Sequence, residues 1–258
     1  MINSFKKYLQ DIKKSEIEEL PVNHIANLNY LEEFINQKLI AHDYLGDKCE
    51  VFGEHFLYTF YGRPAFKLND DNAYPVCFVF EKPKQNPQKA FPFDSGAFHH
   101  NRMAEFFDMT NVKIEDFDIT EKDENENIFK IIENFFNSNE DYYNENAAED
   151  INIPNDIETV RGYLKMISAK EVAGLDDRKS AIELLYDFPF ALNNGMLKLV
   201  ILPKIDFYLN GKVIALEELI ENMKNDYKCE ISTYDQSTTN PVSSSYVDIR
   251  KMVMDYIF

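Results

Sequence analysis

The sequence has no tryptophan and contains few cysteines, glycines and prolines for its 258 residues. Its three cysteines, Cys49, Cys77 and Cys229, are an odd number without a Cys-x-x-Cys spacing, which argues against a disulfide framework and a zinc site. Cys77 lies in an apolar run, where we expect it to pack as a small hydrophobe. Ten prolines and eight glycines are too few for a fibrous or low-complexity chain. We therefore expect a globular protein with an apolar and aromatic core.

Long apolar runs are also missing. No stretch approaches the ~18 consecutive apolar residues that span a bilayer. The N-terminal sequence is charged from Lys6 onward and has no apolar region of the kind found in secretory signals. We therefore expect a cytoplasmic protein with no membrane partner.

Positive charge is scarce, because 45 acidic residues against 27 basic ones give a net charge of −18. Such a field repels nucleic-acid phosphates, and no block of basic residues with interleaved aromatics compensates for it. A protein target or partner is expected in preference to nucleic acid. An acidic surface can also bind a basic protein, as inhibitors and antitoxins from phages or plasmids often do. A non-enzymatic interaction protein of toxin–antitoxin or phage-defence type is therefore an open alternative.

The hydrophobic pattern favours an α+β fold. The segments 74–80 and 196–202 are continuous apolar runs, as expected of strands buried on both faces. Further strands are predicted at 22–26, 56–61, 180–188 and 227–234. Helices are predicted at 3–19, 27–39, 99–107, 127–136, 157–172, 213–223 and 246–258. Because strands and helices do not alternate strictly, we predict a central mixed sheet with flanking helices.

The segment 114–150 is unusually acidic, with thirteen Asp or Glu residues against two Lys. Outside the predicted helix at 127–136, we expect it to form a solvated loop or a mobile insert. It is the best candidate for a subdomain boundary, but the sequence shows no second core. We therefore predict a single α+β domain over 1–258 with an acidic insert at about 114–150.

Several catalytic signatures are absent, namely GxGxxG, GxxxxGK[ST], HExxH and GxSxG. A metal cluster of His55, Asp94, His99 and His100 is disfavoured, because adjacent histidines point in different directions on a helix or strand. We therefore predict no metal site. Asp94 and Ser95 could form a carboxylate and a nucleophile, although Asp-Ser-Gly is more typical of a turn.

Three segments carry a more specific pattern. The segment 23–28 contains His24, the segment 57–66 reads LYTFYGRPAF, and the segment 176–203 contains Glu183 within DDRKSAIELLYDFPFALNNGMLKLVILP. In this order they resemble the ADP-ribosyltransferase superfamily, where a histidine, a strand aromatic and a strand-opening glutamate follow one another. The resemblance implies an ADP-ribosyltransferase-like fold and an enzyme that uses NAD as substrate and transfers ADP-ribose to a macromolecular target.

The resemblance also implies roles for individual side chains. His24 would bond a hydroxyl of the nicotinamide ribose, and Tyr58 or Tyr61 would stack on the nicotinamide. Glu183 would stabilise the positive charge that develops on the ribose as the N-glycosidic bond breaks. The expected catalytic residues are therefore His24, Tyr58 and Glu183. Glu183 also stands between apolar neighbours, and burying a carboxylate is costly without a partner or a function.

The pyrophosphate of NAD would pair with an arginine. Arg63, just after the aromatic strand, is one candidate and Arg178 is a second. The sequence departs from the superfamily at two places. Lys38 stands where a glycine is usual before Leu39, and the strand that carries Tyr58 lacks the usual Ser-Thr-Ser-type signature.

Overall fold

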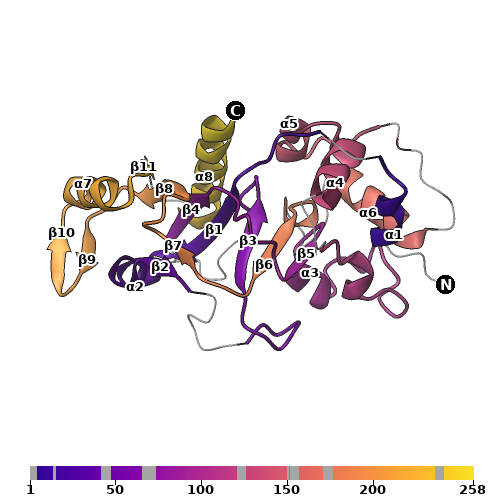
Figure 1. Cartoon of the computed structure of the whole chain (residues 1–258), viewed down its shortest axis with the longest axis horizontal. Coiled ribbons are helices and arrows are strands. Elements are labelled where there is room, and N and C mark those ends of the chain that lie inside the picture. Colours follow the sequence, from indigo (N-terminus) through magenta and orange to yellow (C-terminus); the bar gives the residue numbers. More distant parts are fainter. Residues whose placement is uncertain are drawn as a thin grey trace. The chain divides into compact units, whose positions relative to one another are not determined.

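A computed structural model describes residues 5–13, 16–41, 48–65, 74–120, 126–149, 151, 157–170, 177–235 and 241–258. The chain divides into two compact units. Unit 1 comprises Met1–Glu19, Lys48–Glu54 and Lys84–Tyr186, and unit 2 comprises Leu20–Asp47, His55–Pro83 and Asp187–Phe258. Both units contain helices and strands, which confirms the α+β class (Figure 1). That the chain is a single domain stays a prediction.

Unit 2 is built on five strands in the order β11-β8-β4-β1-β3. These strands are β1 (Val22–Asn27), β3 (Leu57–Tyr61), β4 (Pro75–Phe80), β8 (Leu197–Pro203) and β11 (Glu230–Tyr234). β11 runs parallel to β8, whereas the other neighbouring pairs are antiparallel. The predicted mixed sheet is therefore confirmed.

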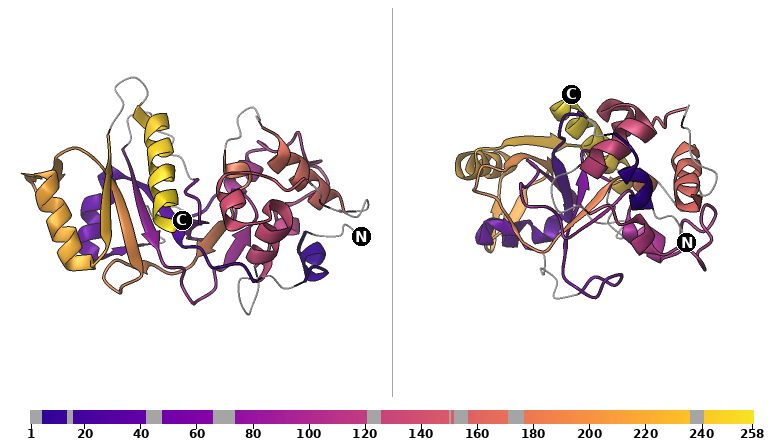
Figure 2. Two further views of the ribbon diagram at one scale, coloured as in Figure 1. Left: turned by 90° about the horizontal axis from the view of Figure 1, so that it is seen from above. Right: turned by 45° about the vertical axis from the view of Figure 1, so that its right-hand side comes forward.

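β4 lies in the middle of these five strands, and all six of its residues are buried. Cys77 lies opposite Ile25 of β1 and Ile201 of β8, and burial raises the pKa of its thiol. It therefore packs as the small hydrophobe that the apolar run predicts. The C-terminal helix α8 (Pro241–Ile257) packs on one face of the sheet, with α2 (Leu31–Gln37) and α7 (Leu216–Tyr227) on the other (Figure 2).

The chain after β1 begins a helix as predicted but does not continue it to residue 39. The Asn27 side chain accepts a hydrogen bond from the Asn29 amide at 3.0 Å and so caps the 3-10 helix η1 (Leu28–Tyr30), after which α2 follows. Lys38 ends α2 with a positive φ of 56°. This is the conformation that glycine adopts most readily, so the lysine forms the turn that a glycine would usually make.

Short strands surround the sheet of unit 2. β2 (Leu39–Ile40) pairs with β7 (Phe190–Ala191), and β9 (Phe207–Leu209) forms a hairpin with β10 (Lys212–Ile214). The hairpin turns at Asn210-Gly211, and both residues have positive φ. The helix predicted at 213–223 begins later, at Leu216, because β10 occupies its first residues.

Unit 1 consists mainly of short helices beside one pair of strands. Its elements are α1 (Phe5–Gln10), β5 (Lys89–Phe91), α3 (Ser95–His99), η2 (Ile114–Phe117), α4 (Glu126–Phe136), α5 (Asn139–Tyr143), α6 (Glu158–Ser168), η3 (Asp177–Lys179) and β6 (Glu183–Tyr186). β5 and β6 are antiparallel, with Phe91 opposite Glu183. β5 lies in a stretch where the sequence pattern predicts no strand.

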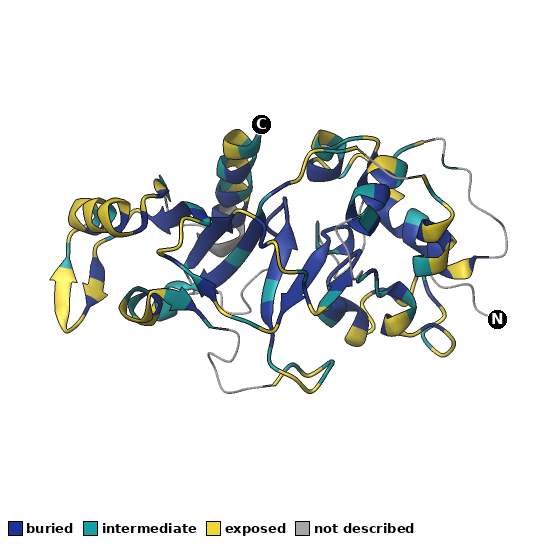
Figure 3. Cartoon of the chain, in the orientation of Figure 1, coloured by how far each residue is buried: buried dark blue, intermediate teal, exposed yellow. Residues whose placement is uncertain are grey.

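Aromatic side chains form the core of unit 1. Phe93 and Phe117 meet edge-to-face with 4.8 Å between ring centroids, and Phe107 meets Phe117 in the same way at 4.9 Å. Phe5 of α1 and Phe135 of α4 add to this cluster. Figure 3 shows that β5, β6 and the inward faces of the helices of unit 1 are largely buried. The absence of tryptophan is offset by packed phenylalanine and tyrosine rings.

Three local predictions for unit 1 are wrong. The helix predicted at 3–19 ends at Gln10, and residues 16–20 are not helical. The helix predicted at 99–107 lies instead at Ser95–His99 and is followed by turns. Within the acidic segment, Tyr142 and Tyr143 of α5 are fully buried, so this part is packed structure rather than a solvated loop. The apolar and aromatic residues of the segment face inward, whereas acidic residues such as Glu133 stay exposed.

Gly162 provides a test of the packing in unit 1. A Cβ atom at this position in α6 would lie 2.7 Å from the Phe106 carbonyl oxygen and would also overlap the Phe107 ring. We predict that Gly162→Ala lowers the free energy of unfolding by about 1–3 kcal/mol, because the steric overlap outweighs the better helix propensity of alanine. Chemical denaturation measures this change.

The control is Asn225→Ala on the exposed face of α7, which changes propensity without a clash. It should leave stability unchanged or raise it slightly. A Gly162→Ala protein as stable as the wild type would contradict the close packing of α6 on the 106–107 segment.

Candidate functional site

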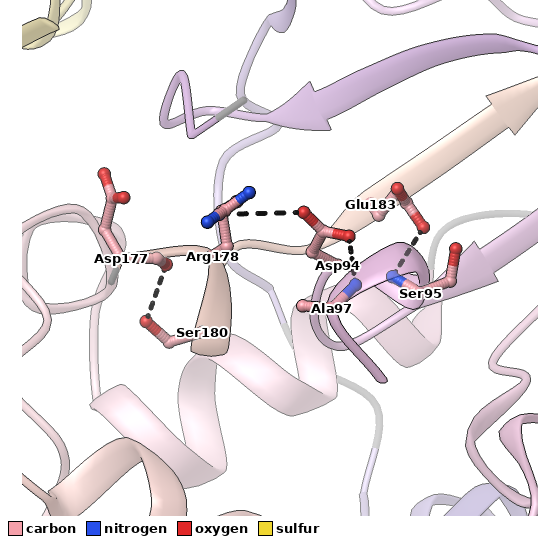
Figure 4. A network of polar contacts seen from close by, with 7 residues as sticks. All are labelled: Asp94, Ser95, Ala97, Asp177, Arg178, Ser180 and Glu183. Atoms are coloured by element: carbon pink, nitrogen blue, oxygen red, sulfur yellow. Dashed lines mark hydrogen bonds and ion pairs between the residues drawn. The ribbon is translucent and has the colours of Figure 1, made fainter. Parts of the chain in front are cut away.

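Glu183 is the buried carboxylate around which the polar contacts of unit 1 gather. It opens β6, and only 2% of its surface is exposed. Its Oε2 atom accepts a hydrogen bond from the backbone amide of Ser95 at 3.0 Å (Figure 4). The contact is possible because β5 pairs with β6, and the chain leaves β5 and turns at residues 92–95 beside the start of β6. The burial that the apolar neighbours of Glu183 predict is therefore observed.

Asp94 holds the turn that carries the Ser95 amide. Its Oδ1 atom accepts a hydrogen bond from the Ala97 amide at 2.9 Å and caps α3. Its own amide donates to the Arg178 carbonyl oxygen at 3.1 Å. The second carboxylate oxygen, Oδ2, lies 3.9 Å from Nε of Arg178, and both side chains are largely buried. Asp94 thus links the turn, the short helix and η3.

The electrostatic surroundings favour a proton on Glu183. Burial, followed by the nearby negative charge of Asp94, raises the pKa of Glu183 to about 8. The Ser95 amide acts in the opposite direction, because its hydrogen bond favours the charged carboxylate. The net result is a carboxyl group that is mostly neutral at pH 7 and can give up its proton within a physiological range.

The Ser95 hydroxyl lies in the same buried position. Ser95 is 0% exposed, and its Oγ atom makes no contact with hydrogen-bond geometry among the residues that the structure describes. A buried hydroxyl normally finds a partner, so this one is available to a group that enters the site or to the carboxyl of Glu183 after a small rotation.

The acidic segment supports the chain that leads into β6. The Tyr142 hydroxyl accepts a hydrogen bond from the Ile182 amide at 2.9 Å, directly before Glu183. The Ser180 hydroxyl lies 3.3 Å from Oε1 of Glu145. It also lies 3.5 Å from the Asp177 carbonyl oxygen (Figure 4). Residues of 114–150 therefore help to position Glu183, a role that their composition does not suggest.

The other residues of the predicted site lie in unit 2. His24 is the third residue of β1 rather than a strand-end residue, and its Nδ1 atom donates to the Tyr58 carbonyl oxygen at 2.9 Å. Burial lowers the pKa of His24, so the ring is neutral at pH 7. The strands that carry His24 and Tyr58 are therefore side by side. The Tyr58 side chain is partly exposed.

Tyr61 and Arg63 are interior residues of unit 2. The fully buried Tyr61 hydroxyl accepts a hydrogen bond from the Leu20 amide at 2.7 Å, and the Arg63 side chain is also fully buried. Their assignment to NAD stays a prediction.

The sequence pattern assigns His24, Tyr58, Arg178 and Glu183 to one site. The structure describes Arg178 and Glu183 with Asp94 in unit 1, and His24 with Tyr58 in unit 2. The sequence does not identify Asp94 as the neighbour of Glu183, and it favours a turn over a carboxylate and nucleophile at Asp94-Ser95. The detectable signal is the spacing from Asp94 to Ala97, which is that of a helix cap. No local sequence pattern identifies Tyr142, because its role depends on a hydrogen bond with Ile182, 40 residues further along the chain.

Within the described parts of the chain, no group of three or more His, Cys, Asp or Glu side chains could hold a metal ion. His99 and His100 instead face Glu50, at 3.7 Å and 3.9 Å between side-chain atoms. None of the helices described is both long enough and apolar enough to cross a bilayer.

Comparison with known proteins adds no relative. No protein-family model, no curated protein and no solved structure matches the chain.

The protonation of Glu183 predicts a pH-dependent effect on stability. The folded-state pKa of about 8 lies above the ordinary value of 4.5, so the stability that the bound proton contributes is complete below pH 4.5 and is lost as the pH rises through 8. Glu183→Gln keeps an oxygen for the Ser95 amide and cannot ionise. At about pH 9 we expect it to raise the free energy of unfolding by at least about 1.4 kcal/mol, the value of one pKa unit.

Denaturant unfolding from pH 4 to 9 measures this difference, which should shrink toward acid pH. Glu140→Gln is the control, because Glu140 is an exposed glutamate of α5 in the same unit. Parallel stability curves for the wild type and Glu183→Gln would contradict the assignment of a raised pKa to Glu183.

Proposed function

We propose that the protein binds NAD, cleaves its N-glycosidic bond and transfers the ADP-ribose to a macromolecular target, with Glu183 as the catalytic carboxylate. The observation that carries the proposal is the burial of Glu183 at the start of β6 beside Asp94 and the Ser95 amide. A buried carboxyl next to a second carboxylate is destabilising for the fold, which is typical of groups kept for chemistry.

The chemistry requires a fixed negative charge. As the bond between C1′ of the ribose and the nicotinamide nitrogen breaks, nicotinamide leaves with the electron pair and positive charge develops on the ribose. An ionised Glu183 would stabilise that charge in a site with little water. The oxygen or nitrogen of the acceptor then forms the new bond to C1′, and its proton passes to the carboxylate or to solvent.

The state of Glu183 in the free protein implies a pH dependence. The carboxyl is mostly protonated at pH 7 because its pKa is raised to about 8, whereas the proposed role needs the charged form. The rate should therefore rise with pH through this range. A cationic nicotinamide ring bound nearby would favour the charged form and move the rise to lower pH.

The remaining roles rest on the superfamily resemblance. His24 would bond the nicotinamide ribose, Tyr58 or Tyr61 would stack on the nicotinamide ring, and Arg63 or Arg178 would pair with the pyrophosphate. The neutral His24 ring suits this role, because its Nδ1 atom already donates to Tyr58 and leaves Nε2 for a hydroxyl.

Release of nicotinamide from NAD tests the proposal. We predict that the wild-type protein releases nicotinamide and that Glu183→Gln lowers kcat by about 10²–10³ with little change in KM, the loss typical of a group that acts mainly in the transition state. Glu140→Gln should keep wild-type activity.

Calorimetric titration with NAD separates binding from chemistry. Glu183→Gln should still bind NAD, because it loses only the charge. A wild-type protein that neither binds NAD nor releases nicotinamide would contradict the proposal, as would a fully active Glu183→Gln variant.

A second candidate function, a binding protein for a basic partner, is favoured by the β9–β10 hairpin. Tyr208 and Val213 lie opposite each other on the two strands and are 69% and 72% exposed. Exposed acidic residues follow on α7, among them Glu217 and Glu218. An exposed apolar pair next to acidic side chains, in a chain of net charge −18, suits a basic protein with an apolar contact residue.

Replacing both Tyr208 and Val213 by serine should abolish capture of a basic protein in pull-downs at low salt. Val247→Ser is the control, because Val247 is similarly exposed on α8. We expect capture by the wild type to weaken as salt is raised, since the acidic residues contribute to binding. Capture that is insensitive to salt, or unaffected by the double substitution, would count against this candidate.

A further inference from the structure

We propose that Asp94 is a positioning residue for the proposed reaction, because its carboxylate fixes the turn that brings the Ser95 amide to Glu183 and sets the electrostatic surroundings of that carboxyl. The inference rests on the proposed function for its catalytic part. Its structural part concerns the free protein and can be tested without NAD.

The first step is that the amide and both carboxylate oxygens of Asp94 contact other residues of the cluster. Its amide donates to the Arg178 carbonyl oxygen, Oδ1 accepts from Ala97, and Oδ2 faces Nε of Arg178. The adjacent Ser95 amide is the one that donates to Glu183 at 3.0 Å. Any rotation of the Asp94 backbone would therefore change the direction of the hydrogen bond that Glu183 accepts.

The second step is that the core holds this turn on both sides. Phe93 and Phe98 are stacked on each other with 5.8 Å between ring centroids, and each also packs against Phe117. Gly96 lies inside the turn, where a Cβ atom would come within 3.1 Å of Oδ1 of Asp94. The small residue and the two rings leave the Asp94 carboxylate a narrow range of positions close to Glu183.

The third step concerns the charged groups near Glu183 in the described chain. Asp94 is the charged neighbour that raises the pKa of Glu183, whereas Ser95 lowers it. Arg178 of η3 faces Asp94, and Glu145 lies farther along the cluster against Ser180. From α5 the uncharged Tyr142 hydroxyl accepts a hydrogen bond from the Ile182 amide, directly before Glu183. From the paired strand β5, the ionisable residue is Lys89, whose Nζ lies 4.9 Å from the centroid of the Phe52 ring.

The buried Ser95 hydroxyl is an independent observation that points to the same place. It has no hydrogen-bond partner among the described residues, and the turn fixed by Asp94 places it beside Glu183. A substrate hydroxyl or the ionised carboxyl could take this group as a donor.

The experiment begins with the free protein. Carboxyl carbons of ¹³C-labelled glutamate are titrated by NMR, and the Glu183 signal is assigned by its loss in Glu183→Gln. Asp94→Asn keeps the side-chain oxygen that caps α3 and removes the negative charge. We expect the Glu183 midpoint to fall below its wild-type position, whereas Asp108→Asn, which removes an exposed turn carboxylate of the same unit, leaves it unchanged. An unchanged midpoint in Asp94→Asn would overturn the electrostatic role.

The second arm uses NAD. In Asp94→Asn the rise of kcat with pH should move to lower pH. The plateau should fall about tenfold or more, because the ion pair of Asp94 with Arg178, which helps to hold the turn that carries the Ser95 amide, is lost. Asp94→Glu keeps the negative charge but not the cap of α3. Its kcat should therefore rise over the same pH range as in the wild type but reach a lower plateau value.

The outcomes of the two arms are distinguishable. A shifted Glu183 midpoint in a protein that releases no nicotinamide would contradict the proposed function and leave the structural role of Asp94 standing. Nicotinamide release with a pH profile unaltered by Asp94→Asn would overturn the positioning role while the proposed function stands.

Discussion

The hydrogen bond between the Ser95 amide and Glu183 is the contact on which the organisation of unit 1 depends. A carboxyl group removed from water costs several kcal/mol unless it is neutralised or hydrogen-bonded. Glu183 meets this requirement in two ways. It accepts a hydrogen bond from the Ser95 amide, and its pKa is raised to about 8, so the carboxyl group is mostly neutral at pH 7. The turn at Asp94, the β5–β6 pair and the approach of η3 all serve to bring these groups together.

The surrounding core explains how such an arrangement is maintained. The aromatic cluster of unit 1 anchors the chain on both sides of the Asp94 turn through Phe93 and Phe98. The acidic segment adds Tyr142, whose hydroxyl satisfies the amide just before Glu183. The packed aromatic core therefore holds in place buried polar groups whose burial alone would destabilise the fold. Such support by surrounding packing is expected of a functional site.

The sequence predicts those parts of the fold that depend on local pattern. The continuous apolar run of β4, the periodic residues of α4 and the Asn27 cap are all found near the expected positions. β5 and α5 were missed, because three-residue and five-residue elements are stabilised by distant contacts rather than by their own propensity. The helix predicted at 3–19 fails for the same reason, since the core contacts only its first turns.

The candidate site is predictable in part. The apolar neighbours of Glu183 indicate its burial, and the sequence predicts strands at 22–26 and 56–61 that carry His24 and Tyr58. That these two strands pair is a finding of the structure. The partners of Glu183 could not be predicted, because they depend on strand pairing between residues about 90 positions apart. Single-sequence patterns carry no information about such contacts.

A crystal structure of the protein with a hydrolysis-resistant NAD analogue is the most direct test of the account. We predict that the analogue places the anomeric carbon of its nicotinamide ribose against the Glu183 carboxyl group, with the Ser95 amide still donating to that carboxyl. An analogue bound at saturation but remote from Glu183 would contradict the role assigned to this carboxyl group.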